Sequence, residues 1–558
     1  MKNDFTYKDL KELADVCIRF YNTSLRKEDY SKKRRMLAGW VEKFHRESRT
    51  LTPKVKEAIE KLEDGHAVLL MTAHQPNLFA YSGVIRKATL NQALSEKIKE
   101  KLNLPVISLF GIADQDFTDD RWVKSTLIPD VERRNGTLEL RVKLPEKTML
   151  NKTPKPTRET LERWRKTLEA WIRQKTQSIK KLCKELKIEG EIQWRPLNDN
   201  LETFWRTVEE AYKRAENYAD FNAYILSKIV NESWEYDTLF CRFSECQRIF
   251  KEEFEFLLKN FEAYSKKVRE AIVMKKEAEG GGVYEREYQT IPFWYHCDCG
   301  SKARLLAERR RDALTGHGRC VKCEKEYRID LMSGNETKIS EIIDKVSARS
   351  ITMPMIFFKG LGVSCYVGGV GGIIYLKQAK YVAEKMGISF PPVVVWRPHD
   401  IYLGIAQLEA ILTYKKLTGT YNLTKNSEAK TELARRITNI KDEIEKLEMQ
   451  KEKLKNDIKT SKEKKIKKIK ELTDKQREIR WRRKLPTLAR NMILLENVER
   501  VMNLHPSIID YAVNIGLKDL NKQWIKHLNR VEGLTKDLNL VTFLDKSFPS
   551  IKERVIKR

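Results

Sequence analysis

The sequence has no long hydrophobic segment and no apolar leader. No window approaches the roughly 18 uninterrupted apolar residues that a membrane-spanning helix needs. The N-terminal residues 1–8 are polar and charged, so they lack the apolar core of a signal peptide. These two absences predict a cytoplasmic protein with no membrane partner.

The sequence also lacks the cysteine pattern of a disulfide-bonded protein, because its nine cysteines are odd in number and mostly scattered. One group is clustered, as Cys297-x-Cys299 and Cys320-x-x-Cys323. Two chelating pairs on adjacent turns can place four thiolates around one Zn²⁺, and the segment between them has the length of a short β-ribbon. The motif predicts a structural zinc site. The alternatives are unmetallated cysteines, or His296 or His317 in place of one ligand.

Acidic residues are in deficit: 79 Asp and Glu stand against 108 Lys and Arg, giving a net charge of +29 and a pI near 9.5. This balance favours polyanionic partners, such as nucleic acid, a nucleotide cofactor or an acidic metabolite. The alternative is a surface of ion-pair networks, as in proteins adapted to high temperature. With 558 residues and 41% hydrophobic composition, the chain can bury a core spread over two to four structural units.

Buried-strand patterns alternate with helical ones and predict an α/β fold. Residues 67–73 and 105–110 are continuous apolar runs of the kind found in parallel sheets, and a helix is predicted between them over 84–102. Further along, a strand is predicted at 355–358, a helix over 375–386 and a strand at 393–396. Residues 1–64 and 155–275 have helical periodicity.

Polar residues follow three of these strands. They are His74, Gln75 and Asn77; Asp114 and Asp116; and Arg397 with His399 and Asp400. In open α/β sheets, ligands bind at the carboxyl ends of the strands. Two carboxylates spaced i, i+2 could bind an ammonium group or a metal, or act as a general base; a helix N-cap is the alternative for one of them.

A glycine-rich turn spans residues 366–372, Tyr-Val-Gly-Gly-Val-Gly-Gly. Glycines let backbone N–H groups approach a ligand closely, as phosphate- and carboxylate-binding loops do. The spacing matches neither a Walker loop nor a dinucleotide fingerprint. The alternative is a strand-to-helix turn that needs glycine only for its geometry.

A heptad stripe predicts a long antiparallel helical hairpin. On its first arm, apolar residues fall on alternating four- and three-residue steps, interrupted only at Lys451; a weaker stripe (Ile466, Ile469 and Leu472) follows a polar break near Thr460-Ser461. The first stripe consists of Leu433, Ile437, Ile440, Ile444, Leu447, Leu454 and Ile458. The second arm is very basic, with Lys462, Lys464, Lys465, Lys467, Lys468, Lys470, Arg480, Arg482 and Arg483.

Together these segments resemble the bacillithiol-biosynthesis cysteine-adding enzymes, the BshC family. Ala73-His74-Gln75 stands where the family has Gly-Gln-Gln after the first strand, and Asp114-Gln115-Asp116-Phe117 matches an Asp-His-Asp-aromatic stretch. Ala219-Asp220-Phe221 matches another family segment, and residues 365–375 match the family's Ala-Tyr-Val-Gly-Gly-x-Gly-Glu-Ile-x-Tyr. Arg397 and the coiled coil follow where the family has them. The resemblance covers nearly the whole chain, with low identity outside these segments.

The resemblance implies an α/β fold with a Rossmann-like core, a connecting domain and a protruding coiled coil. With the cysteine motif and the heptad stripe added, the expected fold is a Rossmann-like parallel-sheet core with a helical and zinc-ribbon connecting domain and a long antiparallel coiled coil. The expected parts are the first part of the core with N-terminal helices (1–150), a helical region (151–275), a zinc-ribbon-like insertion (276–340), the second part of the core (341–425), a coiled-coil hairpin (426–485) and a C-terminal helical region (486–558).

The resemblance further implies a cysteine ligase that joins cysteine to glucosaminyl-malate or a related amine, and often a homodimer. Structural Zn²⁺ is expected, and an adenine nucleotide stays open as a second cofactor. The core also resembles class I aminoacyl-tRNA synthetases, but H-x-G-H and K-M-S-K-S motifs are absent. The expected catalytic residues are Asp114, Asp116 and Gln75; the expected substrate-binding residues are His74, Asn77, Tyr366, Gly368, Gly369, Gly371 and Arg397.

Two departures from the family pattern bear on activity. Gln115 replaces a family His, and Gly372 replaces a family Glu, so an imidazole and a carboxylate are lost. The zinc motif and the basic hairpin arm are additions to the usual pattern. A changed substrate, an RNA-directed protein that binds or modifies tRNA, and a non-catalytic scaffold are therefore the alternative hypotheses.

Overall fold

The protein is described here from a computed structural model, which covers residues 5–190, 192–273, 287–396, 400–540 and 548. Its centre is a five-stranded parallel sheet in the order β13-β12-β1-β2-β5. The strands are β1 (Val68–His74), β2 (Val106–Ile112), β5 (Leu239–Arg242), β12 (Val363–Val367) and β13 (Val393–Val394). From β1 the chain first adds β2 and β5 on one side of the sheet and then β12 and β13 on the other, as in a Rossmann-like fold. The predicted α/β core is confirmed.

Both faces of this sheet are buried, which explains why its strands are continuous apolar runs. Successive side chains of β1 point to opposite faces: Val68 and Leu70 join one hydrophobic cluster, and Leu69 and Met71 join the other. The first cluster is covered by helices α1 (Leu10–Phe20) and α4 (Ser82–Lys99). The second is covered by α2 (Ser31–Ser48), α3 (Pro53–Asp64), α12 (Thr352–Leu361) and α13 (Ile373–Lys385).

One predicted strand is wrong. Residues 355–358 lie in helix α12, and the strand of the sheet comes after it, at β12. All four side chains are buried, and a short run that is apolar on every side fits a buried helix as well as a buried strand. The helix ends at Gly362, whose φ of +63° turns the chain into β12. Tyr366 and Val367 of the predicted turn therefore belong to the strand.

Residues 155–275 are mainly helical, as predicted, but they contain strand β5 of the central sheet. Leu239–Arg242 is only four residues long, and a run that short gives no period-2 signal. The helices of this region are α6 (Arg158–Leu186), α7 (Trp194–Arg214), α8 (Tyr218–Lys228), α9 (Lys251–Lys259) and α10 (Phe261–Val273). The antiparallel pair β3 (Ser125–Pro129) and β4 (Thr137–Arg141) precedes them.

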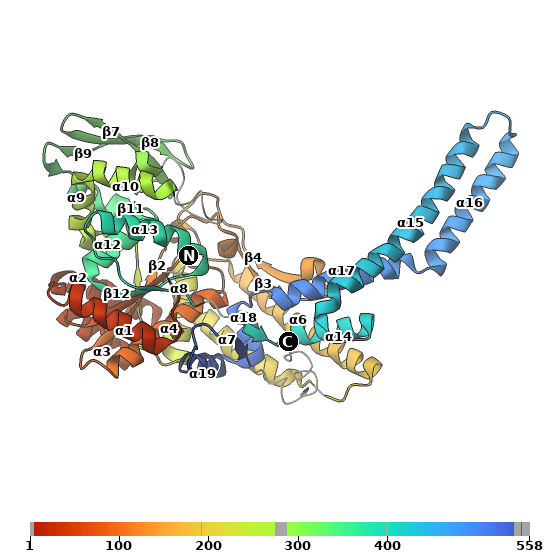
Figure 1. Ribbon diagram of the computed structural model, residues 1–558, viewed down its shortest axis with the longest axis horizontal. Helices are drawn as coiled ribbons and strands as arrows, with labels where there is room; N and C mark the ends of the chain where they lie inside the picture. The colour runs from red at the N-terminus through yellow and green to blue at the C-terminus, as the bar shows by residue number, and fades with distance from the viewer. Residues whose placement is uncertain (1–4, 191, 274–286, 397–399, 541–547, 549–558) are drawn as a thin grey trace.

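The cysteine-bearing segment forms a six-stranded antiparallel sheet in the order β10-β9-β8-β7-β6-β11, seen at one end of the molecule in Figure 1. The β-ribbon expected between the cysteine pairs is the hairpin of β7 and β8. The strands are β6 (Thr290–His296), β7 (Lys302–Arg310), β8 (Ala313–Cys320), β9 (Glu326–Ser333), β10 (Glu336–Thr337) and β11 (Val346–Ala348).

Helices α15 (Asn426–Asn456) and α16 (Lys462–Arg482) form a hairpin that projects from the opposite end of the molecule (Figure 1). On α15 the buried apolar residues are Leu433, Ile440, Ile444 and Leu447, all on the predicted stripe. Ile458 was also placed on that stripe, and this was wrong: α15 ends at Asn456, and Ile458 is 96% exposed in the connection. Asp457 and Thr460 hydrogen-bond to each other in the turn instead.

The base of the hairpin packs against helices that precede and follow it in the chain. α15 and α14 (Ile405–Thr418) both contact α17 (Leu485–Asn503), and α14 also contacts α6. Two further helices, α18 (Ile508–Ile515) and α19 (Leu517–Leu528), lead back to α7 and α4. Strands β14 (Asp400–Tyr402) and β15 (Leu538–Leu540) pair in parallel. No helix among the described residues is long and apolar enough to cross a membrane.

The interruption of the heptad stripe at Lys451 is a polar layer inside the hairpin. Lys451 donates to Gln476 Oε1 at 2.9 Å, and Gln476 Nε2 donates to the Ile444 carbonyl at 3.0 Å and to Glu448 at 2.8 Å. Both Lys451 and Gln476 are buried. A buried lysine is tolerated here because every neighbouring polar group is paired.

We expect Gln476→Ala to lower the local free energy of hairpin opening by about 1–3 kcal/mol, because Lys451 and a backbone carbonyl lose buried partners. The measurement is native-state amide hydrogen exchange in α15 and α16. The double variant Lys451→Leu/Gln476→Leu should recover most of the loss, and the exposed control Gln450→Ala should change little. Unchanged exchange in Gln476→Ala would contradict a stabilising polar layer.

Candidate functional site

A cavity of about 420 Å³ lies at the carboxyl ends of the parallel strands. The chain crosses from β1 through α4 to β2 on one side, while β12 and α13 lead to β13 on the other. The crevice between β1 and β12 is thus the topological switch point, where α/β sheets bind ligands. The N-terminal residues of α4 and the turn before α13 both line the cavity. The N-terminal end of a helix carries a partial positive charge, which favours an anionic ligand.

Two cationic side chains of α4 reach this cavity. Lys87 is 6% exposed, and its Nζ donates to the Ala73 carbonyl at the end of β1 at 3.0 Å. A Cβ added at Gly369 would lie 3.6 Å from that Nζ, so the amine sits against the glycine turn. Arg86 lies over the rings of Trp396 and Trp524, at 5.1 and 5.6 Å. Burial lowers the pKa of both groups, that of Lys87 to about 7.

The two predicted carboxylates occupy different places. Asp116 lines the cavity and is its single carboxylate among the described residues. Burial raises its pKa, and the positive charge of Lys302 opposes that rise. Asp114 is fully buried and is not part of the cavity wall.

Asp114 joins three segments of the chain instead. It accepts hydrogen bonds from the Ser244 backbone N–H at 3.0 Å, from the Ser244 hydroxyl, and from Asn151 Nδ2 at 3.2 Å. Burial raises the pKa of Asp114 to about 6, while the Ser244 bonds oppose the rise. With both oxygens engaged, this carboxylate holds the end of β2 to the segments after β4 and β5.

The polar residues after β1 are also divided. His74 and Gln75 line the cavity, whereas Asn77 is buried outside its wall. Nδ1 of His74 lies 2.8 Å from the Gln75 carbonyl. Burial and the nearby Lys87 lower the pKa of His74 to about 3, so the ring is neutral at physiological pH.

The glycine turn forms a wall of the cavity from Tyr366 to Gly372, including Gly368, Gly369 and Gly371. Tyr366 and Tyr375 are hydrogen-bonded to each other, and burial raises the pKa of Tyr375 to about 12. A Cβ added at Gly372 would lie 2.7 Å from Cε1 of Tyr375. Glycine at this position therefore leaves room for a tyrosine ring where the family's carboxylate would begin.

Arg397, also predicted to bind substrate, lies outside the described residues, as does His399. Several lining residues were not predicted as site residues, among them Arg86, Lys87, Tyr375, Trp396 and His505. Lys87 did leave a sequence signal. It is a lysine within a helix whose neighbouring positions Val84, Ile85 and Ala88 are apolar and buried. A lysine among buried apolar positions points to a functional role, because lysines are rarely buried for structural reasons alone.

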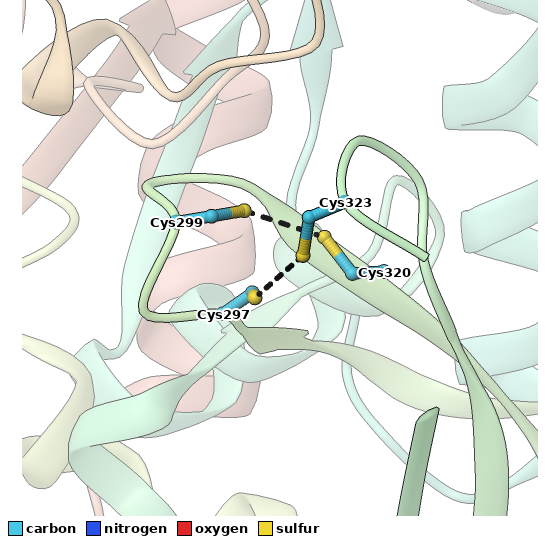
Figure 2. A group of neighbouring side chains, drawn as sticks. All are labelled: Cys297, Cys299, Cys320 and Cys323. Atoms are coloured by element: carbon cyan, nitrogen blue, oxygen red, sulfur yellow. Dashed lines mark hydrogen bonds between the residues drawn. The ribbon is translucent and has the colours of Figure 1, made fainter. Parts of the chain in front are cut away.

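The four cysteines predicted to form one site lie together in the turns β6–β7 and β8–β9, as Figure 2 shows. Their sulfur atoms are all within 4.8 Å of one another, with Cys297–Cys323 at 3.5 Å and Cys299–Cys320 at 3.6 Å. Tetrahedral Zn²⁺ with Zn–S bonds of about 2.3 Å separates its sulfurs by roughly 3.8 Å. The cluster therefore fits a metal ion such as zinc. His296 and His317 are not part of this group.

We expect the affinity of the cavity for a dicarboxylate such as L-malate to fall as the pH rises above about 7. An anion near Nζ binds the protonated form of Lys87, whose pKa burial has lowered to about 7. Affinity should be full below that value and should drop by up to about tenfold per pH unit above it. His74, neutral throughout this range, cannot produce the same profile. Titration calorimetry at pH 6 and 9 tests this, with Lys87→Met as the control that should flatten the profile; equal affinities for the unaltered protein would contradict it.

Comparisons with known proteins agree with this geometry. No curated protein matches the chain. Residues 6–193 match the model of a domain described as "Bacillithiol biosynthesis BshC, N-terminal Rossmann-like domain". This region includes β1, α4 and β2, and therefore His74, Lys87 and Asp116 of the cavity. The chain thus carries the Rossmann-like domain of a bacillithiol-biosynthesis enzyme family, and this supports its membership of the BshC family.

Proposed function

We propose that the protein is a cysteine-adding enzyme that joins cysteine to glucosaminyl-malate or to a related amine. The observation that carries this proposal is the cavity at the switch point, which combines one carboxylate with two cationic side chains. A substrate pair with an ammonium group and carboxylates matches that distribution of charge. The family match over residues 6–193 supports an enzyme of this pathway.

In the proposed reaction, the amine nitrogen forms a bond to the carboxyl carbon of cysteine and a leaving group departs from that carbon. The acyl group must enter in an activated form, for which an adenine nucleotide is the candidate activator. Asp116 is the group available to hold the ammonium and accept its proton, because it is the described carboxylate at the cavity. Burial raises the pKa of Asp116, which makes this carboxylate a stronger base than an exposed aspartate.

The other residues of the cavity wall would bind the substrates. Lys87 and Arg86 lie where a malate carboxylate or a phosphate would be held, and the glycine turn adds backbone N–H groups. Burial, and after it the negative charge of Asp116, raises the pKa of Tyr375, so its hydroxyl stays protonated and can donate a hydrogen bond to the substrate. The neutral ring of His74 and the side chain of Gln75 supply further polar contacts at the end of β1.

The test is turnover of cysteine and glucosaminyl-malate, with and without ATP, followed by mass spectrometry of the amide product. Asp116→Asn should lower turnover by about 10²–10⁴-fold, the range typical for loss of a general base. The control Asp312→Asn alters an exposed carboxylate in the β7–β8 turn and should have no effect. Asp114→Asn should mainly lower thermal stability. Full activity in Asp116→Asn would refute the assigned role.

A second candidate function, binding of RNA through the hairpin, is favoured by the charge difference between its two arms. Helix α16 carries ten basic and four acidic residues, whereas α15 carries eight and seven. In the described part of the chain, six exposed lysines of α16 have no carboxylate partner: Lys462, Lys464, Lys467, Lys468, Lys470 and Lys475. The exposed Trp481 lies between two arginines at the far end of the helix, where it could stack on a base.

Replacing Lys464, Lys467, Lys468 and Lys470 by Glu should weaken binding of bulk tRNA and reduce its salt dependence, because each lost phosphate contact lowers the slope of log K against log [salt] by about 1. Fluorescence anisotropy across a salt series measures both effects. A charge-matched control replaces four exposed lysines at the C-terminal end of α6, namely Lys180, Lys181 and Lys184 in the helix and Lys187 at its C-cap, and should retain the slope. Equal slopes for the two variants would exclude the hairpin as the RNA-binding surface.

A further inference from the structure

The four-cysteine turns do not stand apart from the cavity, because a short segment of chain lies between them. Within this segment, the backbone N–H of Met149 donates to the Gly300 carbonyl at 2.9 Å, in the turn that carries Cys297 and Cys299. On its other side, Leu150 N–H donates to the Asp116 carbonyl at 3.0 Å, and Asn151 N–H donates to the Asp114 carbonyl at 2.8 Å. Residues 149–151 thus join the first cysteine turn to the loop after β2.

The second cysteine turn holds the same segment. Lys322, between Cys320 and Cys323, donates to the Thr148 hydroxyl at 2.9 Å. The backbone of Thr148 in turn accepts from the Thr118 N–H at 3.0 Å. Each cysteine pair therefore has its own hydrogen-bonded path to the loop that bears Asp116.

A single side chain, that of Lys302, provides a third connection between the cysteine-bearing sheet and the loop that bears Asp116. Lys302 is the first residue of β7, three positions after Cys299, and it is only 3% exposed. Its Nζ donates to the Gln115 carbonyl at 2.7 Å and lies 4.4 Å from the ring centroid of Phe117. The ring of Trp294 on β6 completes the enclosure, at 5.4 Å from Nζ. This buried ammonium makes no direct ion pair in the described part of the chain, and its field acts on Asp116.

A buried cation is costly, and a carbonyl with two aromatic faces offsets that cost only where the geometry is held firmly. The strand that begins at Lys302 is anchored by the turn before it. Cys297 N–H donates to the Ser301 carbonyl at 2.8 Å, and Val321 N–H donates to the Lys302 carbonyl at 3.0 Å. A metal ion bound by four thiolates would lock both turns, because structural zinc sites contribute folding free energy directly.

We propose that the four-cysteine metal centre organises the cavity through Lys302, which it clamps against the Asp114–Phe117 loop so that Asp116 faces the cavity as a carboxylate for an ammonium-bearing ligand. Lys302 is then a positioning residue, not a catalytic one, since it acts through Asp116. This inference builds on the proposed function, and it assigns the metal centre a role at the site in place of a purely local one. The ligand class is an amine or amino acid, with L-cysteine as the probe.

The first test compares the zinc-loaded full-length protein with the same protein after zinc removal by a chelator. Metal analysis of the starting material should give one zinc per chain, and Cys320→Ser should lower that value. Hydrogen exchange should increase at residues 114–118 and 148–152 as well as in the cysteine turns. Faster exchange confined to the cysteine turns, or a protein that takes up no zinc, would overturn the proposal.

The second test uses L-cysteine binding measured by calorimetry. Lys302→Met should weaken binding about tenfold, as expected when a buried hydrogen bond and a counter-charge are lost. Lys302→Arg should restore much of the affinity, because a guanidinium keeps both the charge and the donor. The control Arg328→Met removes an exposed charge from β9 of the same sheet and should bind as the unaltered protein does.

The two tests separate the failure of this inference from the failure of the proposed function. If the unaltered protein does not bind L-cysteine, the proposed substrate is wrong, and the exchange experiment still decides whether the metal centre controls the loop. If Lys302→Met binds L-cysteine normally while retaining its fold by circular dichroism, the positioning role of Lys302 is refuted, whatever the substrate.

Discussion

The structure depends on a parallel sheet that is buried on both faces. Because helices cover each side, the strands carry mainly apolar side chains along their length, and the polar residues of β1 and β2 that line the cavity lie at or after the strand ends. The carboxyl ends of β1, β2 and β12 meet around one cavity, together with the N-terminal residues of α4. The position of the cavity is thus a consequence of how the sheet is covered.

Burial around the cavity also sets its electrostatics. Lys87 and Asp116 are opposite charges in the same enclosed space, and burial brings the pKa of each towards neutrality, lowering the one and raising the other. Perturbed pKa values of this kind are concentrated at functional sites. Asp114 is only two residues from Asp116, but Ser244 and Asn151 hydrogen-bond to both of its carboxylate oxygens. Its role is therefore to hold segments of the fold together.

The cysteine-bearing sheet and the α15–α16 hairpin lie at opposite ends of the molecule (Figure 1). The cysteine-bearing sheet reaches the cavity through Lys302 and residues 148–151, so it belongs to the environment of the candidate site. The hairpin extends away from the body, and its charge lies mostly on α16, facing solvent. None of the described hairpin residues lines the cavity.

The sequence by itself determined the elements whose signals are local: the apolar strands β1 and β2, the spacing of the four cysteines, and the heptad stripe up to Leu447. It also placed His74, Gln75, Asp116 and the glycine turn at strand ends. It could not distinguish a four-residue apolar strand from a buried helix, so residues 355–358 were misassigned and β5 was missed.

Only the tertiary structure decided which polar residues share the cavity. Asp114 and Asp116 are alike in the sequence, but the loop after β2 buries the carboxylate of Asp114 and places that of Asp116 at the cavity wall. Lys302 belongs to a segment with no recognisable motif, and the apolar neighbours of Lys87 on its helix do not tell which site the lysine faces; packing brings both side chains to their places. Contacts between residues far apart in the chain depend on how the layers stack, and no local pattern in the sequence encodes that stacking.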